Sequence, residues 1–356
     1  MTRGGEGTGA DGVVVFVPTL DEERFIERCL RSLLDADPLA AAAPLVVADG
    51  GSRDRTREIV RRMAEARPNI VLLDNPDRLQ AAALNLALDP RFADRSVLIR
   101  CDAHAVYPER YVSRLVETLA ARGADSVVVP MDAVAEGGCF QRAAAWIADT
   151  RIGAGGAAHR GGRRSGFVEH GHHAAFRLEA FRALGGYDPG FPTNEDAEYD
   201  ARLIRRGGRI WLAAELRVGY FPRSTPLALW RQYRRYGEGR ARTCLKHRAR
   251  PRLRQLVPAL NLPALAASAA AAPVEPLALA WPASYAALLG GAGVWTAIRR
   301  RSACGLLATV ALGAAHLAWG AGFLLELARA ARAAASSRLR RRRRGGSPLA
   351  GPGGAA

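Results

Sequence analysis

The sequence has few cysteines, a single lysine and no apolar segment near its N-terminus. The cysteines are scattered along the chain at Cys29, Cys101, Cys139, Cys244 and Cys304. Their number is odd and no Cys-x-x-Cys pair occurs, so neither a disulfide framework nor a zinc knuckle is expected, and a reducing compartment fits. Residues 1–12 are rich in glycine and carry acids instead of an apolar core. We expect this N-terminus to be disordered, and secretion through a signal peptide is not supported.

The net charge of the chain is strongly positive, and this excess comes from the C-terminal third. The 356 residues carry a formal net charge of +17. Residues 231–254 contribute +9 and residues 299–356 contribute +10, so the rest of the chain is close to neutral. A neutral N-terminal domain disfavours nucleic acid as a partner. The arginine clusters instead border apolar stretches, as expected for a protein anchored beside anionic lipid headgroups.

Two apolar stretches in this region are long enough to form membrane helices. Residues 255–298 contain no lysine or arginine and one acid, Glu275, and residues 302–325 contain no charged residue. A helix of 24 residues, at ~1.5 Å each, is long enough to cross a ~30 Å hydrocarbon core. We therefore expect two to three membrane helices within residues 246–330, followed by a basic, Gly-rich, disordered tail over residues 331–356.

The number of spans and the side of the tail stay open at this stage. Three spans would place the tail on the opposite side of the membrane from residues 231–254, which breaks the positive-inside rule on one side. Two spans with an interfacial or re-entrant segment would keep both basic clusters in the cytoplasm. Ala-rich soluble helices are the alternative to insertion, and the flanking arginines favour insertion.

Short apolar runs alternate with helical patterns in the N-terminal half of the chain. Buried strands are expected at residues 13–18, 45–49, 70–73, 96–101 and 126–130. This alternation predicts an α/β fold with a doubly wound, mostly parallel sheet, which binds ligands beyond the carboxyl ends of its strands. Residues 137–166 are rich in Gly, Ala and Arg, and we expect them to include a mobile loop.

Acidic residues follow three of the expected strands. Asp21 and Glu22 come after the first strand, Asp49 precedes a Gly-Gly-Ser turn, and Asp102 opens the sequence Asp-Ala-His. Carboxylates in these places can accept hydrogen bonds from a nucleoside, or hold a divalent cation together with phosphate oxygens. Helix capping and turn formation explain each of them equally well when it is taken alone.

Three further segments carry polar groups with chemical potential. A carboxylate of Asn194-Glu195-Asp196 can act as a general base, although acids also favour helix N-termini. The arginines of residues 231–240 suit diphosphate recognition and equally suit a membrane surface. The histidine cluster at His170, His172 and His173 suggests zinc, but no fourth soft ligand lies nearby in the sequence.

In order and spacing, these segments resemble the inverting family 2 glycosyltransferases with the GT-A nucleotide-sugar fold. Residues 18–22 resemble the family's Pro-x-x-Asn-Glu, with Asp21 in place of Asn, and residues 49–56 resemble its Asp-Asp/Gly-Gly-Ser-x-Asp-x-Thr element. Asp102-Ala103-His104 stands at the Asp-x-Asp position, with His104 replacing the second Asp.

The later segments continue the resemblance. Glu195-Asp196 resembles the Glu-Asp acceptor motif, and Gln232 to Tyr236 resembles Gln-x-x-Arg-Trp with Tyr in place of Trp, which implies a single sugar added per acceptor. A closer likeness is to the succinoglycan-biosynthesis type within the family. Its characteristic segments are Asp102–Ala105, Glu169–Arg177, Gln232–Thr243 and His316–Gly320.

The resemblance implies a role for each site residue. It assigns catalysis to Glu195 and Asp196, with Asp196 deprotonating the acceptor hydroxyl. Donor binding falls to Pro18, Thr19, Asp21, Glu22, Asp49, Asp102, Gln232, Arg234 and Arg235. Acceptor binding falls to His172, His173 and Asn194. A Mg²⁺ or Mn²⁺ ion is expected on Asp102 and His104.

The same resemblance implies a catalytic domain over residues 13–245 that faces the cytoplasm from a multi-pass protein of the inner membrane. It implies transfer with inversion from a nucleotide-sugar donor, first of all a UDP-sugar, to a lipid-linked or glycan acceptor. The expected pathway is exopolysaccharide or cell-envelope glycan synthesis, with other polysaccharide-assembly proteins as partners. The alternative is a catalytically degenerate membrane scaffold of such an assembly system.

Overall fold

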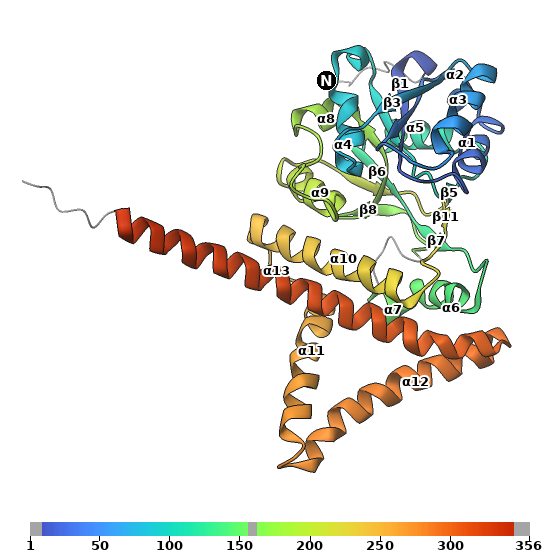
Figure 1. Cartoon of the computed structure of the whole chain (residues 1–356). Helices are drawn as coiled ribbons and strands as arrows, with labels where there is room; N and C mark the ends of the chain where they lie inside the picture. The colour runs from blue at the N-terminus through green and yellow to red at the C-terminus, as the bar shows by residue number, and fades with distance from the viewer. Residues whose placement is uncertain (1–8, 156–161, 345–356) are drawn as a thin grey trace, which may run out of the picture.

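An α/β domain stands on a base of long helices (Figure 1). The computed structural model describes residues 9–155 and 162–344. The strands are β1 (Val13–Thr19), β2 (Leu45–Asp49), β3 (Ile70–Asp74), β4 (Val97–Arg100), β5 (Ala105–Val106), β6 (Ser126–Val129), β7 (Met131–Ala133), β8 (Gly166–Val168), β9 (His172–Arg177), β10 (Ile210–Leu212) and β11 (Val218–Tyr220).

The helices alternate with these strands through the domain and then continue alone to form the base. The α-helices are α1 (Ile26–Leu34), α2 (Pro38–Ala42), α3 (Thr56–Ala66), α4 (Gln80–Asn85), α5 (Tyr111–Arg122), α6 (Cys139–Ala148), α7 (Arg151–Ala154), α8 (Leu178–Ala183), α9 (Glu195–Arg205), α10 (Pro226–His247), α11 (Leu253–Ala271), α12 (Ala280–Arg300) and α13 (Ala308–Arg344). The short 3-10 segments are η1 (Ala10–Gly12), η2 (Leu86–Leu88), η3 (Pro90–Phe92), η4 (Pro276–Leu279) and η5 (Ala303–Leu307).

The eight-stranded main sheet has the order β3-β2-β1-β4-β9-β6-β10-β8, and β5, β11 and β7 form a small second sheet. β1 is parallel to β2 and β4, and β2 is parallel to β3. β9 runs antiparallel to β4 and β6, and β8 runs antiparallel to β10. The expected doubly wound, mostly parallel sheet is therefore confirmed, with β9 inserted antiparallel and β8 added antiparallel at the edge.

The central strands are apolar throughout because both faces of the sheet are covered. On one face Val13, Val15 and Val17 pack with α1, α2, α3 and α5. On the other face Val14 and Phe16 pack with α4, α8 and α9. The carboxyl ends of β1, β2 and β4 thus meet at one edge, held between two hydrophobic layers.

Residues 139–148 and 151–154 form α6 and α7, because Ala143, Ala144 and Ile147 of α6 bury an apolar face. The mobile loop expected within residues 137–166 stays a prediction, since residues 156–161 are not described. One expectation about an irregular segment is wrong. Residues 331–344, expected in the disordered tail, continue α13. Residues 1–8, 156–161 and 345–356 lie outside the described part of the chain.

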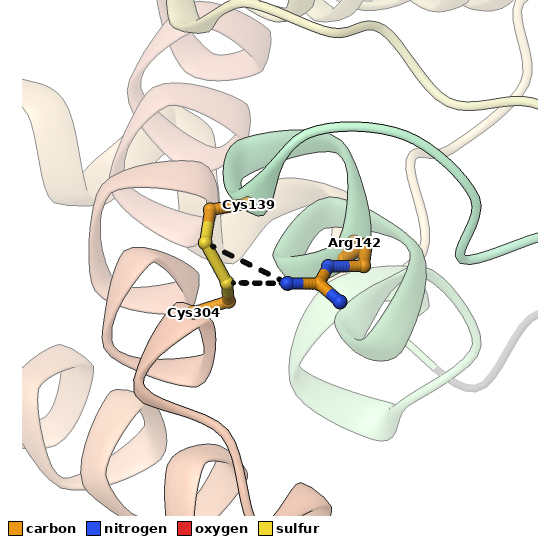
Figure 2. Close-up of a disulfide and its surroundings, with 3 residues drawn as sticks. All are labelled: Cys139, Arg142 and Cys304. Atoms are coloured by element: carbon orange, nitrogen blue, oxygen red, sulfur yellow. Dashed lines mark hydrogen bonds between the residues drawn. A yellow bond between two sulfur atoms is a disulfide. The ribbon is translucent and has the colours of Figure 1, made fainter.

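A disulfide connects the catalytic domain to the helical base. It joins Cys139 at the start of α6 to Cys304 in η5, and the Nη2 atom of Arg142 lies 2.9 Å from Cys304 Sγ (Figure 2). The expectation that the cysteines stay unpaired is wrong for this pair. The 165 positions between the two residues gave no spacing signal, because only the packing of η5 against α6 brings them together.

The base is built on the close packing of α13 along α10 (Figure 1). Glycines allow the two backbones to touch: a Cβ atom on Gly322 would lie 2.0 Å from the carbonyl oxygen of Arg234, and one on Gly237 would lie 2.1 Å from that of Trp319. Distances this short leave no room for a side chain, so the two helices depend on glycine at their crossing.

We predict that Gly322→Ala lowers the thermal unfolding midpoint of the detergent-solubilised protein, because the added methyl group collides with α10 and overpacking costs ~1–3 kcal/mol. The matched control is Gly291→Ala in α12, where a Cβ atom would meet nothing within 4 Å among the described residues. Alanine favours a helix over glycine by ~1 kcal/mol, so the control should leave the midpoint unchanged or raise it. Equal effects of the two substitutions would contradict the packing.

Candidate active site

The two loops that follow the carboxyl ends of β1 and β2 are connected to each other by hydrogen bonds. The backbone N–H of Asp21 donates to Ser52 Oγ at 2.9 Å, and the N–H of Arg53 donates to Asp21 Oδ1 at 2.8 Å. The N–H of Glu22 donates to Thr56 Oγ1 at 2.8 Å. Asp21 has φ of 54°, a left-handed conformation that Asp and Asn tolerate best among residues with side chains. This accounts for Asp at a motif position that resembles Asn.

The carboxylate of Asp49 is turned inward. It accepts hydrogen bonds from the backbone N–H groups of Gly51 and Ser52, from the Ser52 hydroxyl, and from Arg57 Nη1 at 2.6 Å. Burial opposes ionisation, but these donors hold the pKa of Asp49 below its usual value. Asp49 therefore shapes the turn after β2. The residues of this turn and those beside it form the surface that a ligand would meet.

A cavity of about 310 Å³ lies beside this turn, where β2 and β3 end. It is lined by Asp49, Gly50, Gly51, Asp74, Asn75, Pro76 and Arg78. The turn is fixed from the β1 side because the N–H of Gly50 donates to the carbonyl of Thr19 at 2.8 Å. Thr19 and Pro18 thus position the cavity wall, while Asn75 and Arg78 are candidate ligand contacts that the sequence patterns did not single out.

Arg100, the last residue of β4, forms the centre of the site. Its side chain is 4% exposed and contacts Asp102 Oδ1 at 3.3 Å, Asp196 Oδ1 at 2.5 Å and the Tyr187 hydroxyl at 3.1 Å. Burial works against the charge, yet Asp196 and Asp102 hold the pKa of Arg100 well above its usual value. One buried guanidinium therefore joins the end of β4 to the start of α9.

The adjacent carboxyl groups of Glu195 and Asp196 are in opposite states. Burial and the charge of Asp196 raise the pKa of Glu195 to about 7. Asp196 is also buried, but Arg100 and then His173 hold its pKa well below the usual range. Arg100, Tyr187 and His173 all approach Asp196 Oδ1, and Oδ2 faces His172 at 4.0 Å. Asp196 is thus an oriented carboxylate with one oxygen turned away from its buried partners.

The two histidines at the start of β9 differ in environment. His172 Nε2 lies 3.5 Å from Asp102 Oδ2, and burial lowers the pKa of His172 to about 4, so the ring is neutral. His173 lies between the Tyr187 hydroxyl at 2.6 Å and Asp200 Oδ1 at 2.7 Å. Burial opposes its charge, but Asp200 and Asp196 raise the pKa of His173. The imidazole that contacts Asp196 is therefore the one that favours a proton.

Asp102 has the character expected of a metal-binding carboxylate. Gln80 Nε2 donates to its Oδ1 at 2.8 Å, and despite burial Arg100 and the neighbouring histidines lower the pKa of Asp102. His104 Nδ1 lies 2.9 Å from Glu22 Oε1, and its side chain is 42% exposed. The described residues contain no group of three or more His, Cys, Asp or Glu side chains arranged around one point. The donor set therefore fits a hard cation that takes its remaining ligands from phosphate and water.

The loop before α9 connects the site to α10. Asn194 has φ of 61°, and its side-chain amide donates to the carbonyl of Tyr236 at 2.9 Å. Thr193 Oγ1 donates to the carbonyl of Arg235 at 3.0 Å. Gln232 and Arg234 make their side-chain bonds within α10, to the Tyr236 hydroxyl and to Glu238. The structure therefore joins α10 to the site through its backbone carbonyls.

Most of the residues predicted from the sequence lie in one of two connected groups. The first group follows β1 and β2 and contains Pro18, Thr19, Asp21 and Asp49. The second surrounds Arg100 and contains Asp102, His172, His173, Glu195 and Asp196. Glu22 and His104 link the two groups. Arg100, Gln80, Tyr187 and Asp200 were not predicted, although a charged residue that ends a fully buried strand must have buried partners.

A larger hollow of about 670 Å³ lies along α1, away from these groups. It is lined mainly by charged side chains, including Glu27 and Arg31, which pair with each other at 2.9 Å and are largely exposed. Exposed pairs of this kind are ordinary surface features. We place the site at the strand ends, where buried charges converge.

Comparison with known proteins agrees with this arrangement. Residues 14–185 match the glycosyl transferase family 2 domain. The chain is 46% identical over 315 residues to the succinoglycan biosynthesis protein ExoA of Rhizobium meliloti (strain 1021), covering 88% of this chain and 94% of that protein. It is 24% identical over 240 residues to a Methanococcus voltae dolichyl N-acetyl-alpha-D-glucosaminyl phosphate 3-beta-D-2,3-diacetamido-2,3-dideoxy-beta-D-glucuronosyltransferase, covering 63% and 71% of the two chains.

Among solved structures, the chain resembles the mannosyltransferase PcManGT from Pyrobaculum calidifontis, which was determined in complex with GDP-Man and Mn²⁺. The TM-score is 0.58 with 22% sequence identity, and the match covers 85% of this chain and 86% of that one. At this identity the likeness concerns the fold. Together with the strand order it confirms the expected GT-A-like α/β fold.

We predict that Arg100→Met destabilises the fold by ~3–5 kcal/mol at about pH 7.5, because it leaves Asp102 and Asp196 as buried charges without their partner. Arg110→Met, which breaks an exposed pair with Glu117, should change stability by less than ~1 kcal/mol. Chemical unfolding of the solubilised protein measures both effects.

The pH dependence of this difference has a definite sign. Arg100 lowers the pKa of both carboxyl groups in the folded state, so its stabilisation is present above their unfolded pKa and is lost as the pH falls. Without Arg100, protonation instead relieves the buried charges. The gap between wild type and Arg100→Met should therefore narrow at about pH 4.5; a gap that stays constant would contradict the charge network.

Proposed function

The chain belongs to glycosyl transferase family 2, and from this premise we propose that it transfers a sugar, with inversion, from a nucleotide-sugar donor to a lipid-linked acceptor. A UDP-sugar is the proposed donor, and exopolysaccharide or cell-envelope glycan synthesis is the proposed pathway. One observation carries the proposal: Asp102 at the end of β4 and Asp196 at the start of α9 share the Arg100 guanidinium. A metal-binding carboxylate and a base carboxylate are thereby held together at one edge of the sheet.

Asp196 is the proposed general base on the acceptor hydroxyl. Inverting transfer requires one group that removes a proton as the new glycosidic bond forms. Asp196 supports this role because it is ionised, is 17% exposed, and has Oδ2 turned away from Arg100. Glu195 is the more buried of the two and favours its protonated form. We assign Glu195 a supporting catalytic role, since its neutral state avoids a second negative charge beside the base.

The donor is proposed to lie across both residue groups. Pro18, Thr19, Asp21, Glu22 and Asp49 shape the nucleoside side, where the cavity beside β2 lies. Asp102 and His104 would hold a Mg²⁺ or Mn²⁺ ion, which neutralises the charge of the leaving diphosphate when it is bound. Gln232, Arg234 and Arg235 on α10 are proposed to contact the diphosphate after rotation of their side chains, since arginine forks suit phosphate oxygens.

The acceptor is proposed to approach past His172, His173 and Asn194. His172 lies on the Oδ2 side of Asp196, the buried His173 holds Oδ1, and Asn194 joins the preceding loop to α10. We propose that the protein resides in the inner membrane as a multi-pass protein, with this domain in the cytoplasm and with other polysaccharide-assembly proteins as partners. The charge network around Arg100 disfavours the degenerate-scaffold alternative, because a scaffold has no use for opposed carboxyl states.

We predict that Asp196→Asn lowers transfer by at least ~10³-fold while nucleotide-sugar binding survives, because general base catalysis contributes ~10²–10⁴-fold and the amide keeps the shape of the side chain. The matched variant is Glu195→Gln, which should lose much less activity because a raised pKa of about 7 already leaves about half of Glu195 neutral near pH 7. Release of nucleoside diphosphate, with and without acceptor membranes, measures transfer. A larger loss for Glu195→Gln than for Asp196→Asn would reverse the assignment.

We predict that Asp102→Ala weakens donor binding and makes the remaining affinity insensitive to EDTA, because the carboxylate is proposed to hold the divalent cation. Calorimetric titration with UDP-glucose and other nucleotide sugars, in Mn²⁺ and then in EDTA, measures both properties. Asp94→Ala is the control, since Asp94 is 65% exposed and pairs with Arg95 at the surface. Wild-type affinity that does not change with EDTA would rule out the metal assignment.

A further inference from the structure

Exposed apolar side chains are concentrated on α11, α12 and the turn between them. More than half of the large hydrophobic residues that the described chain exposes lie in this segment: Leu253, Val257, Leu260, Val274, Leu277, Leu279, Trp281, Leu288, Val294, Trp295 and Ile298. On α11 the exposed Leu253, Val257 and Leu260 share one face, and alanine and other apolar residues make up most of the remaining faces of both helices. Helices that are apolar on all sides are covered either by protein or by lipid.

The two helices form a hairpin that points away from the catalytic domain (Figure 1). α11 leaves the base, the chain turns at residues 272–279, and α12 returns to the base, where η5 packs against α6. This packing of η5 against α6 fixes the return. Near the turn, Trp281 Nε1 donates to Asn261 Oδ1 at 3.1 Å, which joins the two legs. Both open ends of the hairpin therefore lie on the side of the catalytic domain.

Length and charge suit a hairpin that crosses a bilayer. α11 has 19 residues and α12 has 21, which at ~1.5 Å per residue gives ~28 Å and ~32 Å, close to the ~30 Å hydrocarbon core. Arg252 and Arg254 stand at the start of α11, and Arg299, Arg300 and Arg301 stand at the end of α12. Positive charge thus marks both open ends, as the positive-inside rule requires of cytoplasmic ends.

The tip of the hairpin has a different character. Glu275 is the one acid in residues 255–298 and lies in the turn, where its carboxylate accepts a hydrogen bond from the N–H of Leu277. Val274 beside it is 89% exposed. An acid at the centre of a bilayer is unfavourable, so the tip suits the far headgroup region better than the hydrocarbon core.

Among the described residues, α12 and α13 are long and apolar enough for a span by composition alone, and α11 is less apolar, but the packing of α13 argues against that role. In their most apolar stretches 44% of α13 residues are buried within the protein, compared with 11% for α12. α13 also carries Glu326, which pairs with Arg242 of α10 at 3.0 Å, and Arg329, which pairs with Glu238. Its partner surface is α10, where these two charges are paired.

We propose that α11 and α12 cross the membrane as a two-legged hairpin, while α13 and α10 lie together on the cytoplasmic surface beneath the catalytic domain. The proposal rests on the membrane association included in the proposed function. It resolves the topology that the sequence left open, because both basic clusters then face the cytoplasm.

Single-cysteine reporters in the full-length protein test this arrangement. Val274→Cys reports on the tip, Leu288→Cys on the middle of α12 and Leu325→Cys on α13, and all three positions are exposed. Ile204→Cys on α9 is the control in the catalytic domain. A background with Cys139→Ser, Cys244→Ser and Cys304→Ser removes the thiols that a label could reach in a reduced protein, since Cys29 and Cys101 are buried.

Each variant is reconstituted in phosphatidylglycerol-containing vesicles and labelled with a nitroxide. We expect oxygen to relax the label at 288 while a water-soluble nickel chelate has no effect there, and we expect the chelate to reach the labels at 204 and 325. An impermeant maleimide should modify Val274→Cys only from the face opposite to Ile204→Cys. A nickel-shielded label at 325, or labelling of positions 274 and 204 from the same face, would overturn the proposal.

The outcome is separable from that of the proposed function. Nucleoside diphosphate release by the same four variants is measured alongside, because none of the substitutions lies among the proposed catalytic or binding residues. Activity with labels in the wrong places would refute the hairpin and leave the transferase standing. The expected label pattern, combined with no activity in the unlabelled wild-type protein, would support the hairpin and refute the proposed transferase function.

Discussion

A buried positive charge at the end of β4 constrains the whole site. Arg100 cannot remain in the core without anionic partners, and it finds them in Asp102 on its own strand and in Asp196 and Glu195 on α9. Residues almost a hundred positions apart are therefore held at fixed positions. Because Arg100 stabilises one carboxylate of the adjacent pair, the repulsion falls on the other, and Glu195 takes up the proton. The division between an ionised and a protonated acid follows from one guanidinium.

The parallel core could be predicted because its residues carry the signal locally. Strands such as β1 and β2 are apolar on both faces, so their runs of valine stand out from their neighbours. The reversed direction of β9 left no such mark, since strand direction depends on which neighbours the chain finds later. α6 was missed because Gly137 and Gly138 precede it and its apolar face consists mainly of alanines, with Ile147 as the one large buried side chain. The pairing of Cys139 with Cys304 likewise depends on tertiary packing alone.

The residues of the candidate site also divide into those that the sequence predicts and those that it does not. Asp102, Glu195 and Asp196 were found because their motifs occur in a recognisable order, whereas Arg100 and Tyr187 act through distances that no spacing encodes. The motif residues also have structural roles that a sequence pattern does not reveal. The carboxylates of Asp49 and Asp21 accept hydrogen bonds from backbone N–H groups of the loops around them. A pattern therefore identifies the right residue without showing whether its carboxylate faces a ligand or the backbone.

The helical base is rigidly connected to the candidate site. This connection indicates which kind of acceptor suits the protein. One face of α10 holds the loop before α9 through the carbonyls of Arg235 and Tyr236. Its other face meets α13 at Gly322, with no side chain between the backbones. Asp196 is thus connected to the proposed membrane surface by rigid helices and short hydrogen bonds instead of by a flexible linker. If Asp196 is the general base, as proposed, it is held at a constant height above the lipid. Such a group suits an acceptor hydroxyl that is itself held at a constant height. A soluble acceptor would gain nothing from such an arrangement, whereas a sugar on a lipid carrier would reach the base already oriented, with part of its positional entropy lost beforehand.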